Sequence, residues 1–173
     1  MRIFLTGCHG VGKTTIVKNL NLEKPLVRYT DVDITLNGGV GFAQQLERVT
    51  IMDNILDSLP VGINAIVDRS PYCFEVYNKY LDIPKSEKLA LKRATDSLID
   101  KFIVIPDQVT LYITDNLEDI KVKINKRGRV GMKEDNDDFT NSTYKDFDSL
   151  VEWYSIIPIH IDEAIDYINR LLL

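Results

Sequence analysis

The chain has 173 residues, of which 45% are hydrophobic and 27% charged, and its net charge is −5. These proportions are typical of a folded globular protein and exclude a fibrous or disordered chain. The acidic balance disfavours a broad nucleic-acid-binding face. No apolar run is long enough to span a membrane, and Cys8 and Cys73 lack the spacing of metal ligands. We therefore expect one cytoplasmic domain over residues 1–173 that binds no membrane; whether it forms a homodimer stays open.

A G-x-x-x-x-G-K-T motif occupies residues 7–14. The apolar segment before it, Ile3–Leu5, is typical of a buried strand, and residues 14–20 can form a helix with an apolar face. In this order of strand, loop and helix, backbone N–H groups and a helix N-terminus converge on an anion. The motif therefore predicts a phosphate-binding loop, and the alternative is a glycine-rich turn that binds nothing.

We expect this loop to bind ATP and Mg²⁺. Lys13 would reach the β- and γ-phosphates, and the Thr14 hydroxyl would join waters and phosphate oxygens around the metal. The residues assigned to cofactor binding are Gly7, His9, Gly10, Val11, Gly12, Lys13, Thr14 and Thr15.

A second strand is predicted over residues 26–30, and Asp31 and Asp33 follow it. Ligands of doubly wound sheets bind at the carboxyl ends of the strands. Either aspartate can therefore contact the substrate, and Asp31 or Asp33 can take a proton from a substrate hydroxyl or hold Mg²⁺ through water. The alternative is that both residues belong to a turn, where aspartate is common.

Residues 37–41 are rich in glycine, and apolar positions then recur at helical spacing from Phe42 to Leu59. Gln44, Gln45 and Arg48 lie near the start of this helix as substrate-binding candidates. A glutamine amide offers a donor beside an acceptor, which matches the edge of a nucleobase. A solvated helix face is the alternative for each of the three.

The predicted third strand, residues 62–67, ends in Asp68-Arg69-Ser70. A carboxylate at the end of a strand beside a phosphate loop can bind Mg²⁺ through water or act as a base, and Arg69 can contact phosphate oxygens with two N–H groups. A purely structural ion pair is the alternative. Pro71 suits the first turn of the helix that follows.

Two further elements carry no evident chemistry. A helix is predicted over residues 85–102, with Leu89, Ala90, Ala94, Leu98 and Phe102 as its buried stripe. Residues 109–114 are rich in β-branched and aromatic side chains and predict the fourth strand.

Residues 121–133 contain six basic side chains and no acidic one. A basic helix end that continues into glycines is what a closing lid needs, because arginines there can neutralise a phosphoryl group in transfer. We expect a lid at about residues 126–138, with Arg127 and Arg129 as its catalytic side chains. A solvated loop paired with the acidic residues after it is the alternative.

The remaining chain predicts a helix over residues 139–154, a strand over 156–161 and a last helix capped by Asp162. The proline in this strand, Pro158, favours an edge position or a strand start. His9 and His160 have no partner at triad or metal spacing, so we expect neither to be catalytic.

Together, the phosphate loop, Asp68-Arg69-Ser70 and the segment with Arg127 and Arg129 resemble the P-loop nucleoside and nucleotide kinases over most of the chain. The likeness is greatest to the thymidylate kinase and deoxynucleoside kinase group. It implies a three-layer α/β/α fold with a five-stranded parallel sheet in the order 2-3-1-4-5. It also implies lid arginines, and a base-reading glutamine at Gln45, with Gln44 as the rival position.

Two departures from that group leave the substrate open. Thymidylate kinases usually have an acidic residue where this chain has Cys8-His9, and deoxynucleoside kinases usually have glutamate at the position of Asp68.

The expected function is ATP-dependent phosphoryl transfer to a nucleoside, deoxynucleoside or nucleoside monophosphate. Lys13, Asp68, Arg69, Arg127, Arg129 and Asp33 are the expected catalytic residues, and Thr14 and Asp68 the expected metal ligands. The expected substrate contacts are Asp31, Asp33, Gln44, Gln45, Arg48 and Arg69. Two alternatives remain: a kinase acting on a modified nucleotide or an end in DNA, and an ATPase or switch that needs no small acceptor.

Overall fold

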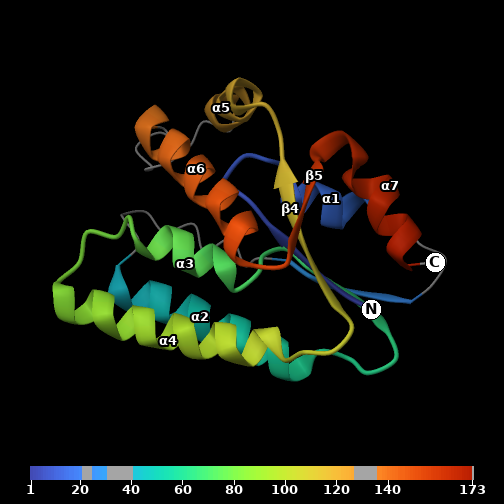
Figure 1. Cartoon of the computed structure of the whole chain (residues 1–173), viewed down its shortest axis with the longest axis horizontal. Coiled ribbons are helices and arrows are strands. Elements are labelled where there is room, and N and C mark those ends of the chain that lie inside the picture. Colours follow the sequence, from blue (N-terminus) through green and yellow to red (C-terminus); the bar gives the residue numbers. More distant parts are fainter. Residues whose placement is uncertain (21–24, 31–40, 127–135, 173) are drawn as a thin grey trace.

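A five-stranded parallel sheet forms the centre of the structure, a computed structural model that describes residues 1–20, 25–30, 41–126 and 136–172 (Figure 1). The strands are β1 (Arg2–Thr6), β2 (Leu26–Tyr29), β3 (Asn64–Val67), β4 (Gln108–Thr114) and β5 (Ile156–His160). Their order in the sheet is β2-β3-β1-β4-β5. The predicted fold class, strand number and strand order are confirmed.

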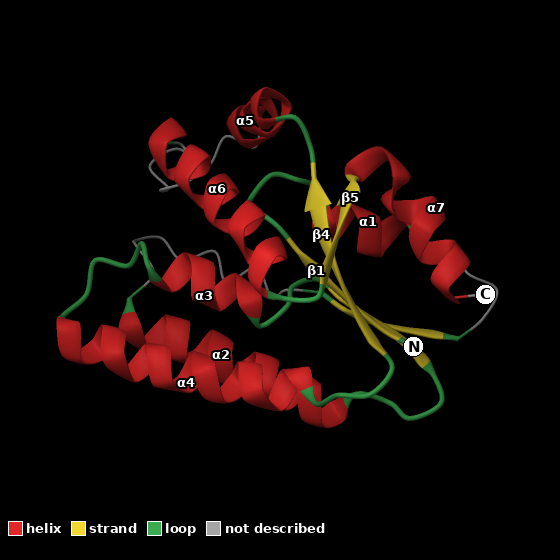
Figure 2. Ribbon diagram, viewed as in Figure 1, coloured by secondary structure: helices red, strands yellow, loops and turns green. Residues whose placement is uncertain are grey.

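Helices cover both faces of the sheet (Figure 2). The helices are α1 (Lys13–Asn19), α2 (Phe42–Ser58), α3 (Tyr72–Asn78), α4 (Lys85–Ile103), α5 (Leu117–Lys126), α6 (Asp137–Trp153) and α7 (Ile161–Leu172). One face carries α1 and α7, the other carries α2, α3, α4 and α6, and α5 lies beyond the end of β4 (Figure 1). The structure therefore has the three predicted layers.

The register of the sheet brings the ends of three strands together. β1 lies between β3 and β4, with Phe4 opposite Val67 and Thr110. Because all strands are parallel, the loops after β1, β3 and β4 leave the same edge of the sheet. The phosphate loop, Asp68 and the start of α5 are thereby placed at one edge.

The core on the α4 side of the sheet is aromatic. Phe102 of α4 contacts Phe4 edge to face, with ring centroids 4.7 Å apart, and Tyr72 of α3 at 5.4 Å. Such pairs stabilise a core beyond the area they bury. They fix α3 and α4 against β1, and so hold the helix that follows Asp68-Arg69-Ser70.

The predicted buried stripe of α4 is wrong at its N-terminal half. The buried residues are Leu91, Thr95, Leu98, Ile99 and Phe102, whereas Leu89 is 50% exposed and Ala90 is also exposed. The prediction skipped Thr95 because it followed apolar residues alone, yet the threonine side chain has a hydrogen-bond partner inside the protein. The stripe is therefore rotated toward Thr95.

The edge prediction for Pro158 is confirmed, since β5 is the last strand of the sheet. Proline lacks a backbone N–H and cannot donate to a neighbouring strand. On the outer side of an edge strand there is no neighbour, so no hydrogen bond is lost there. Within the part of the chain that is described, none of the helices combines the length and the apolar character needed to cross a bilayer.

Candidate functional site

The loop between β1 and α1 turns on glycines with positive φ, including Gly7 at +139°, Gly10 at +81° and Gly12 at +103°. L-residues with side chains rarely adopt these angles, whereas glycine does so readily. Gly12 directly precedes Lys13, the first residue of α1. The local structure is thus the strand, tight loop and helix that the motif predicts.

The path of this loop predicts a large cost for Gly7→Ala. A Cβ on Gly7 would lie 2.8 Å from the carbonyl oxygen of Ile113, a backbone atom that no rotamer change can move, and its φ of +139° adds strain. We expect the free energy of unfolding in urea to fall by more than about 2 kcal/mol.

Gly41→Ala is the matched control for this measurement. No atom of a described residue lies within 4 Å of a Cβ built on Gly41, and its φ of −86° is open to any residue. We expect a change below about 1 kcal/mol, which is the usual cost of alanine at a helix N-cap. Equal losses in the two variants would contradict the steric argument.

The side chain of Lys13 is folded onto the loop. Its Nζ donates to the carbonyl oxygens of Gly7, at 2.8 Å, and Cys8, at 2.9 Å, and the residue is 6% exposed. Burial lowers the pKa of Lys13, and the nearby Arg69 guanidinium lowers it further. Two cations held this close favour an anion between them, as a phosphate-binding loop requires.

Cys8 and His9, which fill variable positions of the motif, face inward. Burial raises the pKa of the Cys8 thiol to about 11, so this side chain is neutral at physiological pH and packs in the core. The ring of His9 lies 4.6 Å from the ring of Tyr77 in α3, with an angle of 42° between their planes. His9 therefore links the phosphate loop to α3.

Asp68 lies beside the phosphate loop because β3, which it follows, pairs with β1. The Thr14 hydroxyl donates to Oδ2 of Asp68, a residue that is 2% exposed. Hydroxyl and carboxylate oxygens suit Mg²⁺, which takes few protein ligands and keeps several waters. In the described ranges, no three side chains of His, Cys, Asp or Glu gather as a metal site. Thr14 and Asp68 therefore fit a Mg²⁺ shell completed by water and phosphate oxygens.

Arg69 lies over the ring of Tyr77, with its Cζ 5.7 Å from the ring centroid. The Tyr77 hydroxyl donates to the carbonyl oxygen of Gly7 over 3.5 Å. Burial raises the pKa of Tyr77 well above 10, and Arg69 opposes this rise in part, so the hydroxyl stays protonated. A cation over a buried aromatic face is held in place. Tyr77 thus positions Arg69 beside the phosphate loop.

The three predicted polar residues of α2 differ in their surroundings. Gln44 accepts a hydrogen bond from the backbone N–H of Gly41 through Oε1, at 3.0 Å, and so caps its own helix. Gln45 is 3% exposed, and its Nε2 donates to Oδ1 of Asn78 in α3, at 2.8 Å. Arg48 is half-buried one turn further along. Gln45 is the one whose amide crosses to another helix.

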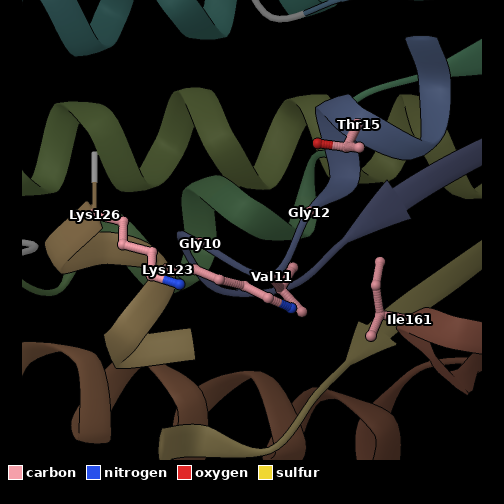
Figure 3. A pocket seen from close by; sticks show the side chains of 7 residues that line it. All are labelled: Gly10, Val11, Gly12, Thr15, Lys123, Lys126 and Ile161. Carbon is pink, nitrogen blue, oxygen red and sulfur yellow. The ribbon is translucent and has the colours of Figure 1, made fainter. Parts of the chain in front are cut away.

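A cavity of about 330 Å³ lies on the α5 and α7 side of the phosphate loop (Figure 3). Its lining residues are Gly10, Val11, Gly12, Thr15, Lys123, Lys126 and Ile161. Figure 3 shows the two lysines of α5 on one side of the loop and Ile161, at the start of α7, on the other. The cavity therefore combines loop backbone, positive charge and an apolar wall.

Asp115, directly after β4, positions Lys123 at this cavity. Lys123 donates to Oδ2 of Asp115, whose side chain is 6% exposed. The other carboxylate oxygen accepts from the backbone N–H of Asn116 at 2.8 Å, and His160 Nε2 lies 3.7 Å from it. Asp115 thereby links Asn116 and Lys123 to His160, the last residue of β5.

Several predicted site residues lie outside the described residues. These are Asp31, Asp33, Arg127 and Arg129. Of the expected lid, residues 126–138, the description covers Lys126, as the last residue of α5, and residues 136–138, where α6 begins. The lid and its arginines stay predictions.

Sequence reasoning missed four residues of this region. The sequence patterns do not single out Asn78, Asp115, Ile161 or Tyr77 as site residues. For Tyr77 and Asn78 a signal existed, because an aromatic and an amide residue stand together on the first helix after Asp-Arg-Ser. Nothing in the local sequence marks Ile161, which reaches the cavity only through the sheet order.

No protein-family model and no curated protein matches this sequence. Solved structures do match it. Deoxyadenosine kinase from M. mycoides with bound dATP is 15% identical with a TM-score of 0.69, and the match covers 99% of this chain and 97% of that chain.

Two other structures extend this likeness. The same kinase with dCMP and dCDP bound is 17% identical, with a TM-score of 0.64 and coverage of 99% of this chain and 98% of that chain. YorR protein from Bacillus subtilis, in complex with phosphorylated GDP, is 18% identical, with a TM-score of 0.58 and coverage of 98% and 92%. With its sheet order and its phosphate loop, the chain thus has the α/β fold of the P-loop deoxynucleoside kinases.

Proposed function

We propose that this chain is an ATP-dependent kinase that phosphorylates a nucleoside, deoxynucleoside or nucleoside monophosphate. The observation that carries the proposal is the two-sided environment of the phosphate loop. One side has the cavity with Lys123 and Lys126, and the other has Arg69 held on Tyr77. A phosphotransferase needs such a pair of sites, one for the donor and one for the acceptor, on either side of the transferred group.

On the donor side, the base and ribose of ATP would occupy the cavity, and its phosphates would lie along the loop. Lys13, bonded to two loop carbonyls, would exchange these partners for phosphate oxygens. Mg²⁺, held by Thr14 and Asp68 with water, would neutralise the charge between the β- and γ-phosphates. Lys123 and Lys126, which line the cavity, add positive charge there.

On the acceptor side, Asp68 would orient or deprotonate the accepting hydroxyl, or bind Mg²⁺ through water. Arg69 would contact phosphate, and Gln45 would bind the base. Asp31, Asp33 and Arg48 are further candidates for this side, and Arg127 and Arg129 for a lid that closes over both sites. Positioning and charge provide most of the catalysis in such enzymes, and charged and hydrogen-bonding side chains of this kind can supply both.

The ligands of the similar structures support the proposal. The kinase from M. mycoides was captured with dATP and with dCMP and dCDP, and YorR protein with phosphorylated GDP. A nucleotide-phosphate role accounts for these ligands and for the loop of the present chain together.

A screen of acceptors with labelled ATP tests the function. Nucleosides, nucleoside monophosphates and a DNA oligonucleotide are each incubated with the chain, ATP and Mg²⁺, and labelled products are separated. A labelled nucleoside or nucleoside monophosphate is the expected result. Labelling of the oligonucleotide alone would favour the DNA-directed alternative. Release of phosphate with no labelled acceptor would favour an ATPase or switch, and either outcome would overturn the proposal.

The ion pair at the cavity predicts an effect on the donor. Asp115→Asn removes the charge that holds Lys123 but keeps an oxygen for the backbone N–H of Asn116. We expect the KM for ATP to rise by about three- to tenfold, since a partly buried charged hydrogen bond is worth roughly 1 kcal/mol or more. Initial rates at varied ATP measure this, and the KM for the acceptor should not change. Asp96→Asn, at an exposed ion pair with Lys92, is the control.

A further inference from the structure

The carbonyl oxygen of Gly7, at the start of the phosphate loop, has side-chain donors from two different helices. Nζ of Lys13 in α1 lies 2.8 Å from it, and the hydroxyl of Tyr77 in α3 lies 3.5 Å from it. A carbonyl oxygen has two lone pairs and can accept both hydrogen bonds. The contact with Tyr77 is nevertheless longer than the usual O–H···O distance of about 2.5–3.0 Å. In this structure, Lys13 is therefore the main donor to Gly7, and Tyr77 is a weak second donor.

Binding of phosphate would take Lys13 away from this carbonyl. In the proposed function, the ammonium of Lys13 leaves the carbonyl oxygens of Gly7 and Cys8 for phosphate oxygens. Gly7 is buried, and a buried carbonyl oxygen that loses its donor raises the free energy of the bound state. The loss lowers the affinity for nucleotide unless another donor replaces Lys13. The Tyr77 hydroxyl can do so, because it needs to approach by less than about 1 Å to reach the usual distance.

Tyr77 contacts Arg69 as well as the loop. Burial raises the pKa of Tyr77 well above 10, and the charge of Arg69 and its hydrogen bond to the phenolic oxygen oppose part of this rise. The hydroxyl therefore stays protonated, and it can accept from Arg69 while it donates to Gly7. The Tyr77 ring packs edge to face on Phe147 of α6, with ring centroids 5.5 Å apart. A small shift of the hydroxyl toward Gly7 thus moves a partner of Arg69 toward the phosphate loop.

We propose that Tyr77 replaces Lys13 as the donor to the Gly7 carbonyl when nucleotide phosphates bind the loop, and that this exchange brings Arg69 toward the transferred group. The inference rests on the proposed function and adds a positioning residue to it. Tyr77 is not a catalytic residue, because it acts through the Gly7 carbonyl and through Arg69. Since one hydroxyl serves both partners, its removal should weaken nucleotide binding and also slow phosphoryl transfer.

Tyr77→Phe removes the hydroxyl and keeps the ring that lies against Arg69 and His9. The Kd for AMP-PNP, a non-hydrolysable analogue of ATP, is measured by calorimetry in the presence of Mg²⁺. We expect it to rise by about three- to tenfold, which is the effect of one hydrogen bond to a buried carbonyl. Tyr80→Phe is the matched control, because the Tyr80 hydroxyl donates to Asp146 at 2.9 Å. It should change the Kd by less than about twofold.

The same change in a Lys13→Ala background isolates the exchange of donors. Without the ammonium, the Tyr77 hydroxyl meets the same Gly7 carbonyl before and after phosphate binds. Tyr77→Phe should then change the Kd for AMP-PNP, titrated to millimolar concentrations, by less than about twofold. A purely structural role of the hydroxyl would give the same factor in both backgrounds, and that result would overturn the proposal. Urea denaturation shows that each variant is folded under the conditions of the titration.

The rate of phosphoryl transfer tests the link to Arg69. For every acceptor that ATP labels, Tyr77→Phe should lower kcat by a similar factor of about three to ten, because the change lies at the loop and not at the acceptor. An unchanged kcat with all of these acceptors would overturn the link between Tyr77 and Arg69.

Failure of this inference can be told apart from failure of the proposed function. If AMP-PNP binds but no acceptor is labelled, the kinase proposal fails, while the Kd values still decide whether Tyr77 replaces Lys13. If acceptors are labelled and Tyr77→Phe leaves the Kd for AMP-PNP unchanged, the exchange fails and the kinase proposal stands. If AMP-PNP does not bind the parent chain, the assignment of the phosphate loop fails and the exchange fails with it.

Discussion

Replacing Lys13 by alanine should lower the rate of phosphoryl transfer by at least about 10³-fold while the chain stays folded. Lys13 is the buried cation of the phosphate loop, 6% exposed and beside a second cation, Arg69. A charge so placed binds transferring phosphate more strongly than a surface charge does, because little water screens it. Its loss should therefore lower kcat as well as raise the KM for ATP.

The same change has a smaller effect on stability. Lys13 donates to the carbonyl oxygens of Gly7 and Cys8, and alanine leaves both without that donor. Removing the ammonium also removes the free-energy cost of burying a charge. That cost is seen in the lowered pKa of Lys13 in the folded state. The lost hydrogen bonds destabilise the variant and the removal of a buried charge stabilises it. We therefore expect the free energy of unfolding to change by about 2 kcal/mol or less.

Lys18→Ala is the control for Lys13→Ala. Lys18 lies in the last turn of the same helix, is exposed and carries the same charge. Its removal should leave kcat and the KM for ATP within about twofold, since exposed charges contribute little. Circular dichroism and urea denaturation show whether each variant folds. Undiminished phosphotransfer by Lys13→Ala would contradict the assignment of the loop.

The sheet could be predicted from the sequence because each strand has its own local signal. β4 is rich in β-branched and aromatic residues, and Pro158 marks an edge strand. The strand order came instead from the resemblance to P-loop kinases. In α4, apolar spacing alone placed Leu89 inside and missed Thr95. A threonine becomes a core residue only when a distant partner, here Asn78, supplies a hydrogen bond.

The candidate site likewise has one part that could be predicted from the sequence and one part that could not. The loop at residues 7–14 and Asp68 follow strands, so their meeting follows from the parallel sheet and could be predicted. The contact of Arg69 with Tyr77 depends on how α3 packs, and the cavity wall at Ile161 depends on the neighbour of β4. Such contacts join residues far apart in the sequence, and no local pattern encodes them.

Asp68→Asn should lower kcat by about 10²- to 10³-fold, and the way it does so separates two roles for the carboxylate. The variant keeps the size of the side chain and an oxygen that can accept from the Thr14 hydroxyl, as Oδ2 of Asp68 does. The loop and β3 should therefore stay in register, and the lost property is the negative charge. Asp53→Asn, at a partly exposed ion pair with Lys101, is the control.

If Asp68 acts on Mg²⁺, the variant should need several times more Mg²⁺ for half-maximal activity and should keep the pH profile of the parent. If Asp68 is the base that accepts the proton of the substrate hydroxyl, the requirement for Mg²⁺ should be unchanged. The acid limb of the profile of kcat against pH should then disappear, because the group that imposes it is gone. Its hydrogen bond to Thr14, the residue expected to bind the metal, makes the first result the expected one. Full activity of Asp68→Asn would exclude both roles and move the search for the base to Asp33.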